Sequence, residues 1–310
     1  PGKYGRIIAD GSQIRKMVEF KDASDAEKAE TLCNSGLMAV RCADLFPLLA
    51  RVTNNNQAGE YYLPDIVGLA IADGRACTVI ETEASDVAGA NSRAELADLE
   101  AIFQHRRRAE LMAAGVSMQA PETVFLAADT EIAADVTIEP FVVFGPGVRI
   151  ATGAHIRAHS HIEGAVIGEG CEVGPFARLR PGTVLEAGAK IGNFVETKKA
   201  HLSAGAKANH LTYLGDVTVG AAANIGAGTI TCNYDGFFKY QTVIGAGAFI
   251  GSNSALVAPV TIGEGAIVAA GSTVTRDVAG DALALVRAEQ TEKPGWAARF
   301  RGLQQAKKGK

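Results

Sequence analysis

The chain has 310 residues, of which 47% are hydrophobic and 21% are charged, so it is long enough for two domains with apolar cores. Its formal net charge of −4 gives no reason to expect a nucleic-acid partner. No apolar stretch approaches the ~18 residues of a membrane span, and five cysteines without a CxxC spacing favour reduced thiols in a cytoplasmic protein.

The first part of the chain, residues 1–92, mixes apolar β-type runs with amphipathic helical stretches. This pattern predicts part of an α/β domain. Ser92 followed by Glu95 indicates the start of a helix through a capping box. An apolar stripe at helical spacing then continues toward Gly115, so we expect a linker helix over residues 93–115.

From Ile132 onward, aliphatic residues recur every six positions, which is the signature of a parallel β-helix. Each hexad supplies a short strand and a turn, three hexads make one coil, and residues eighteen apart, such as Ile244 and Ile262, stack in one internal column. We expect this β-helix over residues 116–280, followed by a tail over residues 281–310. The clearest run is Ile244, Ile250, Leu256, Ile262, Val268 and Val274.

The repeat breaks in two places, between Ile191 and Leu214 and between Ile225 and Ile244. Both breaks carry polar and aromatic side chains, and irregular loops on a solenoid commonly form its binding face. Surface decoration is the alternative interpretation. His210 lies in the first break, and a neutral imidazole that is oriented by a carboxylate can act as a general base near pH 7. Spacing alone leaves that role open.

Three other histidines, His155, His159 and His161, stand close together and raise the question of a zinc site. His155 and His161 are six residues apart, so they lie at equivalent points on adjacent faces of the prism and point in different directions. We therefore interpret all three as surface or turn residues.

Specific motifs carry a family resemblance. In the second half they are FARLRPG at residues 176–182, GNFVETKK at 192–199, NHLTYLGD at 209–216 and NIGAGTITCNYDG at 224–236. In the first part they are YGRI at 4–7, VEFKD at 18–22, NSG at 34–36, NNNQAGEYYLPD at 54–65 and GANSR at 89–93. Together these stretches closely resemble the bacterial bifunctional N-acetylglucosamine-1-phosphate uridyltransferase and glucosamine-1-phosphate acetyltransferase family.

The resemblance implies a left-handed parallel β-helix, preceded by a linker helix and a partial α/β nucleotidyltransferase domain. It implies a homotrimer with acetyltransferase sites between subunits, acting on small molecules without nucleic acid or membrane. The implied reaction moves the acetyl group of acetyl-CoA to the 2-amine of glucosamine 1-phosphate. In a full-length chain, uridylyl transfer from UTP with Mg²⁺ would follow and give UDP-N-acetylglucosamine for peptidoglycan and lipopolysaccharide precursors.

The resemblance also assigns roles to single residues. His210 would be the general base, Glu196 would orient it, and the backbone N–H of Tyr234 would stabilise the oxyanion. The sugar phosphate would contact Arg180, Lys198, Lys239, Tyr213, Asn224 and Asn233. The positions that match coenzyme A contacts are Ala227, Ser252, Ala270 and Arg287.

In the amino-terminal part, the resemblance assigns nucleotide-sugar contacts to Gly5, Glu19, Asn34 and Asn91, with Asn91 also a metal ligand. The family's phosphate loop and its Asp metal ligand belong to the half that precedes residue 1. For this chain as written we therefore expect acetyl transfer alone. Two alternatives stay open, namely another hexapeptide acyltransferase and a non-catalytic trimer that binds nucleotide sugars.

Overall fold

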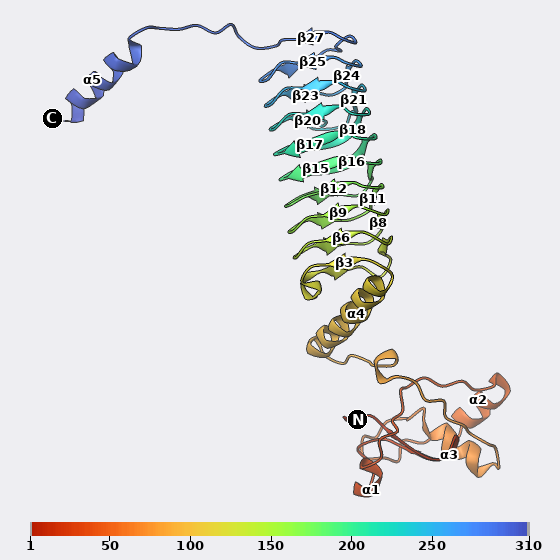
Figure 1. The fold of residues 1–310 in the computed structure, drawn as a ribbon. Coiled ribbons are helices and arrows are strands. Elements are labelled where there is room, and N and C mark those ends of the chain that lie inside the picture. Colours follow the sequence, from red (N-terminus) through yellow and green to blue (C-terminus); the bar gives the residue numbers. More distant parts are fainter. Residues whose placement is uncertain (1, 309–310) are drawn as a thin grey trace. The chain divides into compact units, whose positions relative to one another are not determined.

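The protein is described by a computed structural model over residues 2–308, in which the chain divides into two compact units (Figure 1). One unit reaches to Phe103 and the other begins at Gln104. Over the described part of the chain, no helix combines the length and apolar character that a membrane crossing requires.

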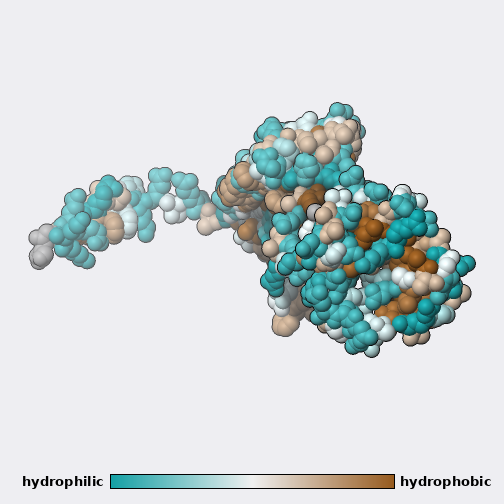
Figure 2. Space-filling view, turned by 90° about the horizontal axis from the view of Figure 1, so that it is seen from below, coloured by the Kyte–Doolittle hydropathy of each residue, from teal (hydrophilic) through white to brown (hydrophobic). Residues whose placement is uncertain are grey.

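The amino-terminal unit is built on a hairpin, in which β1 (Arg6–Asp10) pairs antiparallel with β2 (Gln13–Val18). Its short helices are α1 (Asp25–Lys28), α2 (Cys42–Leu49), α3 (Asp65–Ala72) and the 3-10 turn η1 (Ala84–Asp86). A small apolar core joins the hairpin to α2 and α3, and consists of Ile7, Ile14, Leu48, Ile66, Val67 and Ala70. Many apolar side chains stay outside this core, and hydrophobic patches interrupt the hydrophilic surface in Figure 2.

Helix α4 spans Arg93–Ala113 and confirms the helix that the sequence predicts there. The hydroxyl of Ser92 accepts a hydrogen bond from the backbone N–H of Glu95 at 3.2 Å, and the Glu95 carboxylate accepts one from the N–H of Asn91. The first contact satisfies one of the donors that a helix start leaves free, and the second ties the residue before the cap to the first turn. Farther along, Gln104 both donates to and accepts from the backbone of Leu126, which fixes α4 against the first coil.

The rest of the carboxy-terminal unit is a left-handed parallel β-helix, seen as a column of stacked strands in Figure 1. One sheet contains β3 (Ser117–Met118), β6 (Thr137–Ile138), β9 (His155–Ile156), β12 (Glu172–Val173), β15 (Lys190–Asn193), β17 (Lys207–His210), β19 (Asn224–Ile225), β22 (Phe249–Ile250), β25 (Ile267–Val268) and β27 (Leu283–Ala284).

A second sheet wraps around the other two faces. It contains β4 (Phe125–Leu126), β5 (Glu131–Ile132), β7 (Val143–Phe144), β8 (Arg149–Ile150), β10 (His161–Ile162), β11 (Ala165–Ile167), β13 (Arg178–Leu179), β14 (Thr183–Leu185), β16 (Glu196–Leu202), β18 (Tyr213–Val219), β20 (Ile230–Cys232), β21 (Thr242–Ile244), β23 (Ala255–Val257), β24 (Val260–Ile262) and β26 (Thr273–Val274). The 3-10 turn η2 (Pro121–Thr123) precedes β4.

The six-residue register is confirmed. Ile244 lies directly opposite Ile262 in parallel pairing, and every member of the run from Ile244 to Val274 is buried. Each hexad places one aliphatic side chain inside a narrow prism, so the interior is a continuous apolar column that adjacent coils share. The stack continues beyond the expected end at residue 280, because β27 pairs with β25 and places Leu283 opposite Ile267.

The first break in the repeat has a simple structural cause. Here strands β16 and β18 are seven residues long and pass around a corner of the prism, so each belongs to two faces. Adjacent coils are in register at steps of seventeen residues, as in Ile191 opposite Ala208. Thr197 and Ala208 occupy interior positions that larger aliphatic residues fill elsewhere. Smaller side chains inside a shorter coil explain why the aliphatic pattern fades here.

The second break is an insertion. Val219 lies opposite Ile244, a step of 25 residues from 219 to 244, so this coil carries a protruding segment. Tyr234 and Lys239 form an isolated antiparallel bridge at the base of that segment. The polar and aromatic residues of this break therefore extend outward from the prism as a short hairpin.

A ladder of stacked rings runs along one corner of the prism and reaches into the start of the first break. It consists of Phe141, His159, Phe176 and Phe194, with successive ring centroids 4.8 to 5.2 Å apart. All four residues adopt left-handed backbone angles, with φ between 55° and 61°. The corner requires this unusual conformation, and the side chains compensate for part of its cost by stacking.

The carboxy-terminal tail ends in α5 (Trp296–Lys308), where Trp296 stacks on Phe300 one helical turn away. All five cysteines are free thiols, and burial raises the pKa of Cys77 and of Cys171 above the ordinary value.

Candidate active site

The outward-facing side chains of the first break gather on one face of the prism. Leu179, Thr197 and Leu214 point inward on β13, β16 and β18, so their neighbours along each strand point outward. Glu196 lies opposite Tyr213, and Arg180 follows β13 one coil away. Because adjacent strands are about 4.8 Å apart, these side chains form one continuous surface.

Two arginines on this surface approach the carboxylate of Glu196. Nη1 of Arg180 donates to Oε1 of Glu196 at 2.9 Å, and Arg178 approaches the same oxygen at 3.9 Å. Glu196 is therefore engaged with arginine, and among residues 2–308 no hydrogen bond joins it to His210. The orientation of His210 by Glu196, expected from the sequence, does not match this geometry. Glu196 and His210 belong to different sheets, on either side of a corner.

The imidazole of His210 is hydrogen-bonded to Asn193 instead. Nδ1 of His210 lies 2.8 Å from Oδ1 of Asn193, and the two residues are direct register partners on β15 and β17. The next residue, Leu211, donates its backbone N–H to the carbonyl of Asn193 and has a left-handed φ of 50°. The chain therefore turns the corner immediately after His210, which leaves the imidazole exposed on the outside of the prism.

A second polar group lies on the next coils. Nδ2 of Asn233 donates to Oδ2 of Asp216 at 2.6 Å, and Nζ of Lys198 lies 3.9 Å from the same carboxylate oxygen. Asn233 is only 6% exposed, although it belongs to the outward hairpin. The neighbouring ammonium group of Lys239 is the main cause that lowers the pKa of Lys198 below its ordinary value, and burial is the second. Two lysines held this close form a ready site for a multivalent anion.

Gly215 is buried beneath two of these side chains. A Cβ at this position would lie 2.5 Å from the hydroxyl of Tyr213 and 2.7 Å from Nδ2 of Asn233. Gly215 also donates its backbone N–H to the hydroxyl of Thr231 inside the prism. Tyr213 and Asn233 therefore pack directly over Gly215, and a larger residue there would displace them.

The residues predicted to bind coenzyme A follow one another, coil by coil, along one corner of the prism. His210 lies on the same corner, one coil before Ala227. Backbone and side-chain hydrogen bonds connect each turn to the next. They run from Gly228 N to His210 O at 3.4 Å, from Asn253 N to Ala227 O at 2.7 Å, from Gly271 N to Ser252 O at 2.8 Å and from Arg287 Nη1 to Ala270 O at 2.6 Å. We call the line Ala227, Ser252, Ala270 and Arg287 the small-residue corner. It has small side chains along its length and a guanidinium group at its end.

The two remaining predicted residues, Asn224 and Tyr234, lie on different parts of one coil. Asn224 begins β19, opposite Lys207 on the coil that carries His210. Tyr234 lies at the base of the hairpin, where its hydroxyl donates to the carbonyl of Gly236. The structure therefore places both residues on the coil that follows the one carrying His210.

In the amino-terminal unit, three of the four predicted nucleotide-sugar residues come together. Asn34 donates its backbone N–H to the carbonyl of Gly5 at 2.9 Å, and a Cβ on Gly5 would lie 3.3 Å from the Glu19 carboxylate. Burial, followed by the charge of Asp22, raises the pKa of Glu19. Asn91 is exposed at the start of α4.

The described residues do not form a ligand set for the Mg²⁺ expected at Asn91. Among residues 2–308, no group of three or more His, Cys, Asp or Glu side chains is arranged to hold a metal. One amide oxygen is insufficient for a cation that prefers six oxygen ligands in an octahedral arrangement.

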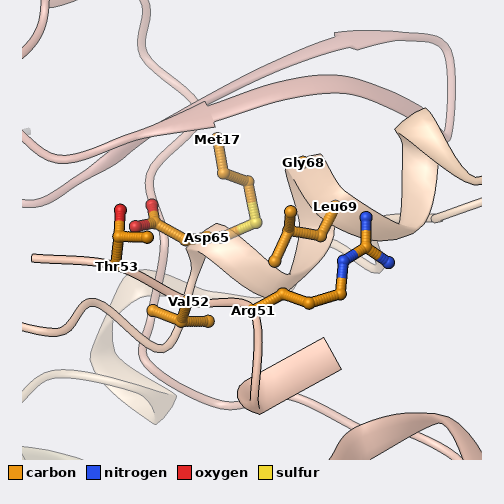
Figure 3. Close-up of a pocket in the computed structure, with 7 residues that line it drawn as sticks. All are labelled: Met17, Arg51, Val52, Thr53, Asp65, Gly68 and Leu69. Atoms are coloured by element: carbon orange, nitrogen blue, oxygen red, sulfur yellow. The ribbon is translucent and has the colours of Figure 1, made fainter. Parts of the chain in front are cut away.

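A shallow pocket lies between β2 and α3 in the same unit (Figure 3). It is lined by Met17, Arg51, Val52, Thr53, Asp65, Gly68 and Leu69. Asp65 and Thr53 lie together on one side, and the guanidinium group of Arg51 lies on the other and pairs with Asp73 at 2.7 Å. Burial is the main cause that raises the pKa of Asp65. The pocket lacks any of the predicted site residues.

On the β-helix surface around His210 and Lys198, three residues were not predicted from the sequence, namely Asn193, Asp216 and Gly215. All three lie within the motifs GNFVETKK and NHLTYLGD. The available signal was the change of coil length from eighteen to seventeen residues, since residue 193 plus seventeen gives His210. Applied to the first break, that step would have identified Asn193 as the neighbour of the histidine.

Comparisons with known proteins place these observations in a family. The family model described as bacterial transferase hexapeptide (six repeats) matches residues 129–164, 164–199 and 241–276. The bifunctional protein GlmU of Sphingopyxis alaskensis is 70% identical over 308 residues, which is 99% of this chain and 68% of that protein. GlmU of Zymomonas mobilis is 60% identical over 302 residues, 97% of this chain and 67% of that protein. Among solved structures, LpxA from Acinetobacter baumannii is similar with a TM-score of 0.45 and 18% identity, over 60% of this chain and 77% of that one.

Proposed function

The chain belongs to the GlmU family of bifunctional proteins, and we propose that its β-helix transfers the acetyl group of acetyl-CoA to the 2-amine of glucosamine 1-phosphate. One observation carries the proposal. His210 lies at the head of the small-residue corner, one coil from Ala227, and next to the surface that carries Arg180 and Lys198. A thioester held along the corner and an amine held on that surface would therefore meet at the imidazole.

The acceptor is held by charge and by the polar side chains that pack over Gly215. Lys198 and Lys239 supply two ammonium groups for a phosphate dianion, and Arg180 adds a planar guanidinium fork. The hydroxyl of Tyr213 and the amide of Asn233 then contact the sugar.

The donor is held along the small-residue corner. Ala227, Ser252 and Ala270 have side chains short enough to let the pantetheine chain lie against the backbone. Arg287 supplies a cation for a phosphate group of coenzyme A. We assign Asn224 to the sugar of the acceptor, as the family resemblance implies.

The chemical step is aminolysis of a thioester. The neutral 2-amine attacks the carbonyl carbon, and the C–N bond forms as the carbonyl electrons move onto oxygen. The backbone N–H of Tyr234 donates to that oxyanion. His210 takes the proton that the nitrogen loses, the C–S bond breaks, and the coenzyme A thiolate leaves and is protonated.

We also propose that the active unit is a homotrimer. Several apolar side chains point outward from the prism faces and stay exposed in one chain, including Val166, Val243, Phe249 and Ile267. A second copy packed against such faces would cover them. In the amino-terminal unit, we assign to Gly5, Glu19, Asn34 and Asn91 the sugar contacts of the family's uridylyl transfer.

The test mixes the purified chain with acetyl-CoA and glucosamine 1-phosphate and follows free thiol. Thiol release that depends on both substrates, and a product with an acetylated 2-amine, are expected. Glucosamine without its phosphate and L-serine serve as alternative acceptors. Faster transfer to serine would support another hexapeptide acyltransferase, and no transfer to any acceptor would support a non-catalytic trimer.

A further inference from the structure

We propose that Asn193 is the positioning residue for the general base His210, an inference that rests on the proposed acetyl transfer. Its amide oxygen lies 2.8 Å from Nδ1 of His210. With the amide in this orientation, Oδ1 is an acceptor and Nδ1 of the neutral imidazole must carry the proton. Nε2 is then the unprotonated nitrogen, and it is free to accept the proton of the attacking amine.

The backbone makes this arrangement rigid. Asn193 and His210 are register partners, and the carbonyl of Asn193 accepts a hydrogen bond from Leu211 on the other side of the histidine. The carbonyl of His210 in turn accepts from Thr212 Oγ1 at 2.7 Å and from Gly228 at 3.4 Å. The imidazole is thus anchored through its ring and through the backbone on both sides.

A neutral amide orients an imidazole without adding charge. A carboxylate in the same place would stabilise the imidazolium and make the free base scarcer at neutral pH. The carboxylate predicted for this role, Glu196, is committed to Arg180. Asn193 therefore orients the imidazole and, because it is uncharged, does not favour the protonated form.

The ionisable groups around His210 come from four strands on the two sides of the corner. Lys190 on β15 is in register with Lys207 on β17, and each lies three residues before its site residue, Asn193 and His210 respectively. Beyond the corner lie Glu196 on β16 and Tyr213 on β18, which pair with each other in register. These groups stay in place when Asn193 alone is changed, so a change in the pH profile would report on position 193.

The experiment compares three variants in the full chain. Asn193→Ala removes the acceptor, and we expect kcat for acetyl transfer to fall about 10-fold while KM for acetyl-CoA changes little. Asn193→Asp keeps the acceptor and adds a charge, so it should restore part of kcat and move the acid limb of the pH profile to higher pH. Glu196→Gln should instead raise KM for glucosamine 1-phosphate, because it releases Arg180, and leave the acid limb in place.

A double-mutant cycle separates positioning from a general structural effect. If Asn193 acts only through the imidazole, adding Asn193→Ala to His210→Ala should change the residual rate by less than about 2-fold. Thermal melts and sedimentation of each variant check folding and assembly. A normal kcat and unchanged pH profile in Asn193→Ala, with active wild-type protein, would overturn the inference. An inactive wild-type protein would overturn the proposed function instead.

Discussion

Asp216 and Asn233 hold each other across one coil, with Nδ2 of Asn233 donating to Oδ2 of Asp216 at 2.6 Å. The pair connects the corner of β18 to the hairpin of the second break, which otherwise leaves the prism. Lys198 lies 3.9 Å from the same carboxylate. One carboxylate therefore positions both an amide and an ammonium group on the proposed acceptor surface.

Replacement of that carboxylate should weaken acceptor binding. In Asp216→Ala the charge-assisted hydrogen bond to Asn233 is lost, which costs about 2 kcal/mol when the remaining group stays buried. We expect KM for glucosamine 1-phosphate to rise about 10-fold or more, and KM for acetyl-CoA to change little. Initial-rate kinetics with each substrate varied in turn measure the two constants. An equal rise in both would indicate that Asp216 supports the fold as a whole.

Removal of the proposed general base should abolish most of the acetyl transfer without unfolding the protein. We expect His210→Ala to lower acetyl transfer about 100-fold or more, since general-base catalysis contributes roughly 10² to 10⁴. The imidazole is exposed, so the thermal midpoint should stay near that of the wild type. Thiol release and a thermal melt on the same preparation provide the comparison. Near-normal turnover would remove His210 from the mechanism.

The closeness of Lys198 and Lys239 leads to a prediction about acceptor binding at alkaline pH. The lowered pKa means that Lys198 loses its proton at a lower pH than an ordinary lysine, and Lys239 is the main cause. Affinity for the sugar phosphate should therefore fall as the pH rises through this lowered pKa. In Lys239→Gln the overall affinity falls, but the alkaline limb should move to higher pH because the main cause is gone.

The measurement is KM for glucosamine 1-phosphate as a function of pH. Lys199→Gln is the matched control, because Lys199 is only the smallest of the causes that lower the pKa of Lys198. Its alkaline limb should move less than that of Lys239→Gln. An equal shift in both variants would mean that general surface charge, and not the specific pair, sets the lysine pKa.

Much of this fold could be predicted because the repeat makes one residue type recur at a fixed position. Ile250 and Val268 are eighteen residues apart and pair in the structure as the hexads require. The internal column depends only on which side chains are apolar, and that information is local to each hexad. The same reasoning explains why the helix at residues 93–115 was found, since a cap and a stripe are local signals as well.

The contacts inside the site were harder to predict because they depend on coil length. A coil of seventeen residues shifts every partner by one, which places Asn193 beside His210 and leaves Glu196 opposite Tyr213. The motif resemblance identified the residues of the surface but not which of them touch. The extent of the last coil was missed for a related reason, since Leu283 and Ala284 follow the repeat without its usual spacing.

The packing over Gly215 should be sensitive to a single methyl group. The three atoms nearest to a Cβ there would all belong to the ends of two side chains, Tyr213 and Asn233. We expect Gly215→Ala to weaken acceptor binding about 10-fold or more while the thermal midpoint changes little, because the interior is untouched. Gly220→Ala is the contrast, since its Cβ would overlap the backbone of Ala246 and should lower the thermal midpoint. The opposite order of thermal effects would contradict this interpretation.

The ring ladder predicts a stability effect away from the site. His159 lies between Phe141 at 5.0 Å and Phe176 at 4.8 Å, with all three rings nearly parallel. Aromatic pairs contribute about 0.5–1.5 kcal/mol each beyond buried area, so His159→Ala should lower the free energy of unfolding by about 1–3 kcal/mol. Alanine also carries a Cβ, so the left-handed backbone at this corner keeps most of its steric cost and the change reports on the rings.

His161→Ala is the matched control, because His161 is an exposed histidine on the neighbouring strand β10. Its effect on the free energy of unfolding should stay within about 0.5 kcal/mol, as for most surface substitutions. Chemical denaturation of both variants under one condition gives the comparison. Because a solenoid is stabilised mainly by contacts between adjacent coils, the loss at His159 should open the coils near residues 141–176 first, and hydrogen exchange should locate it there. Equal destabilisation by the two variants would mean that the stacked rings add nothing to the corner, and that the left-handed positions are held by the backbone hydrogen bonds alone.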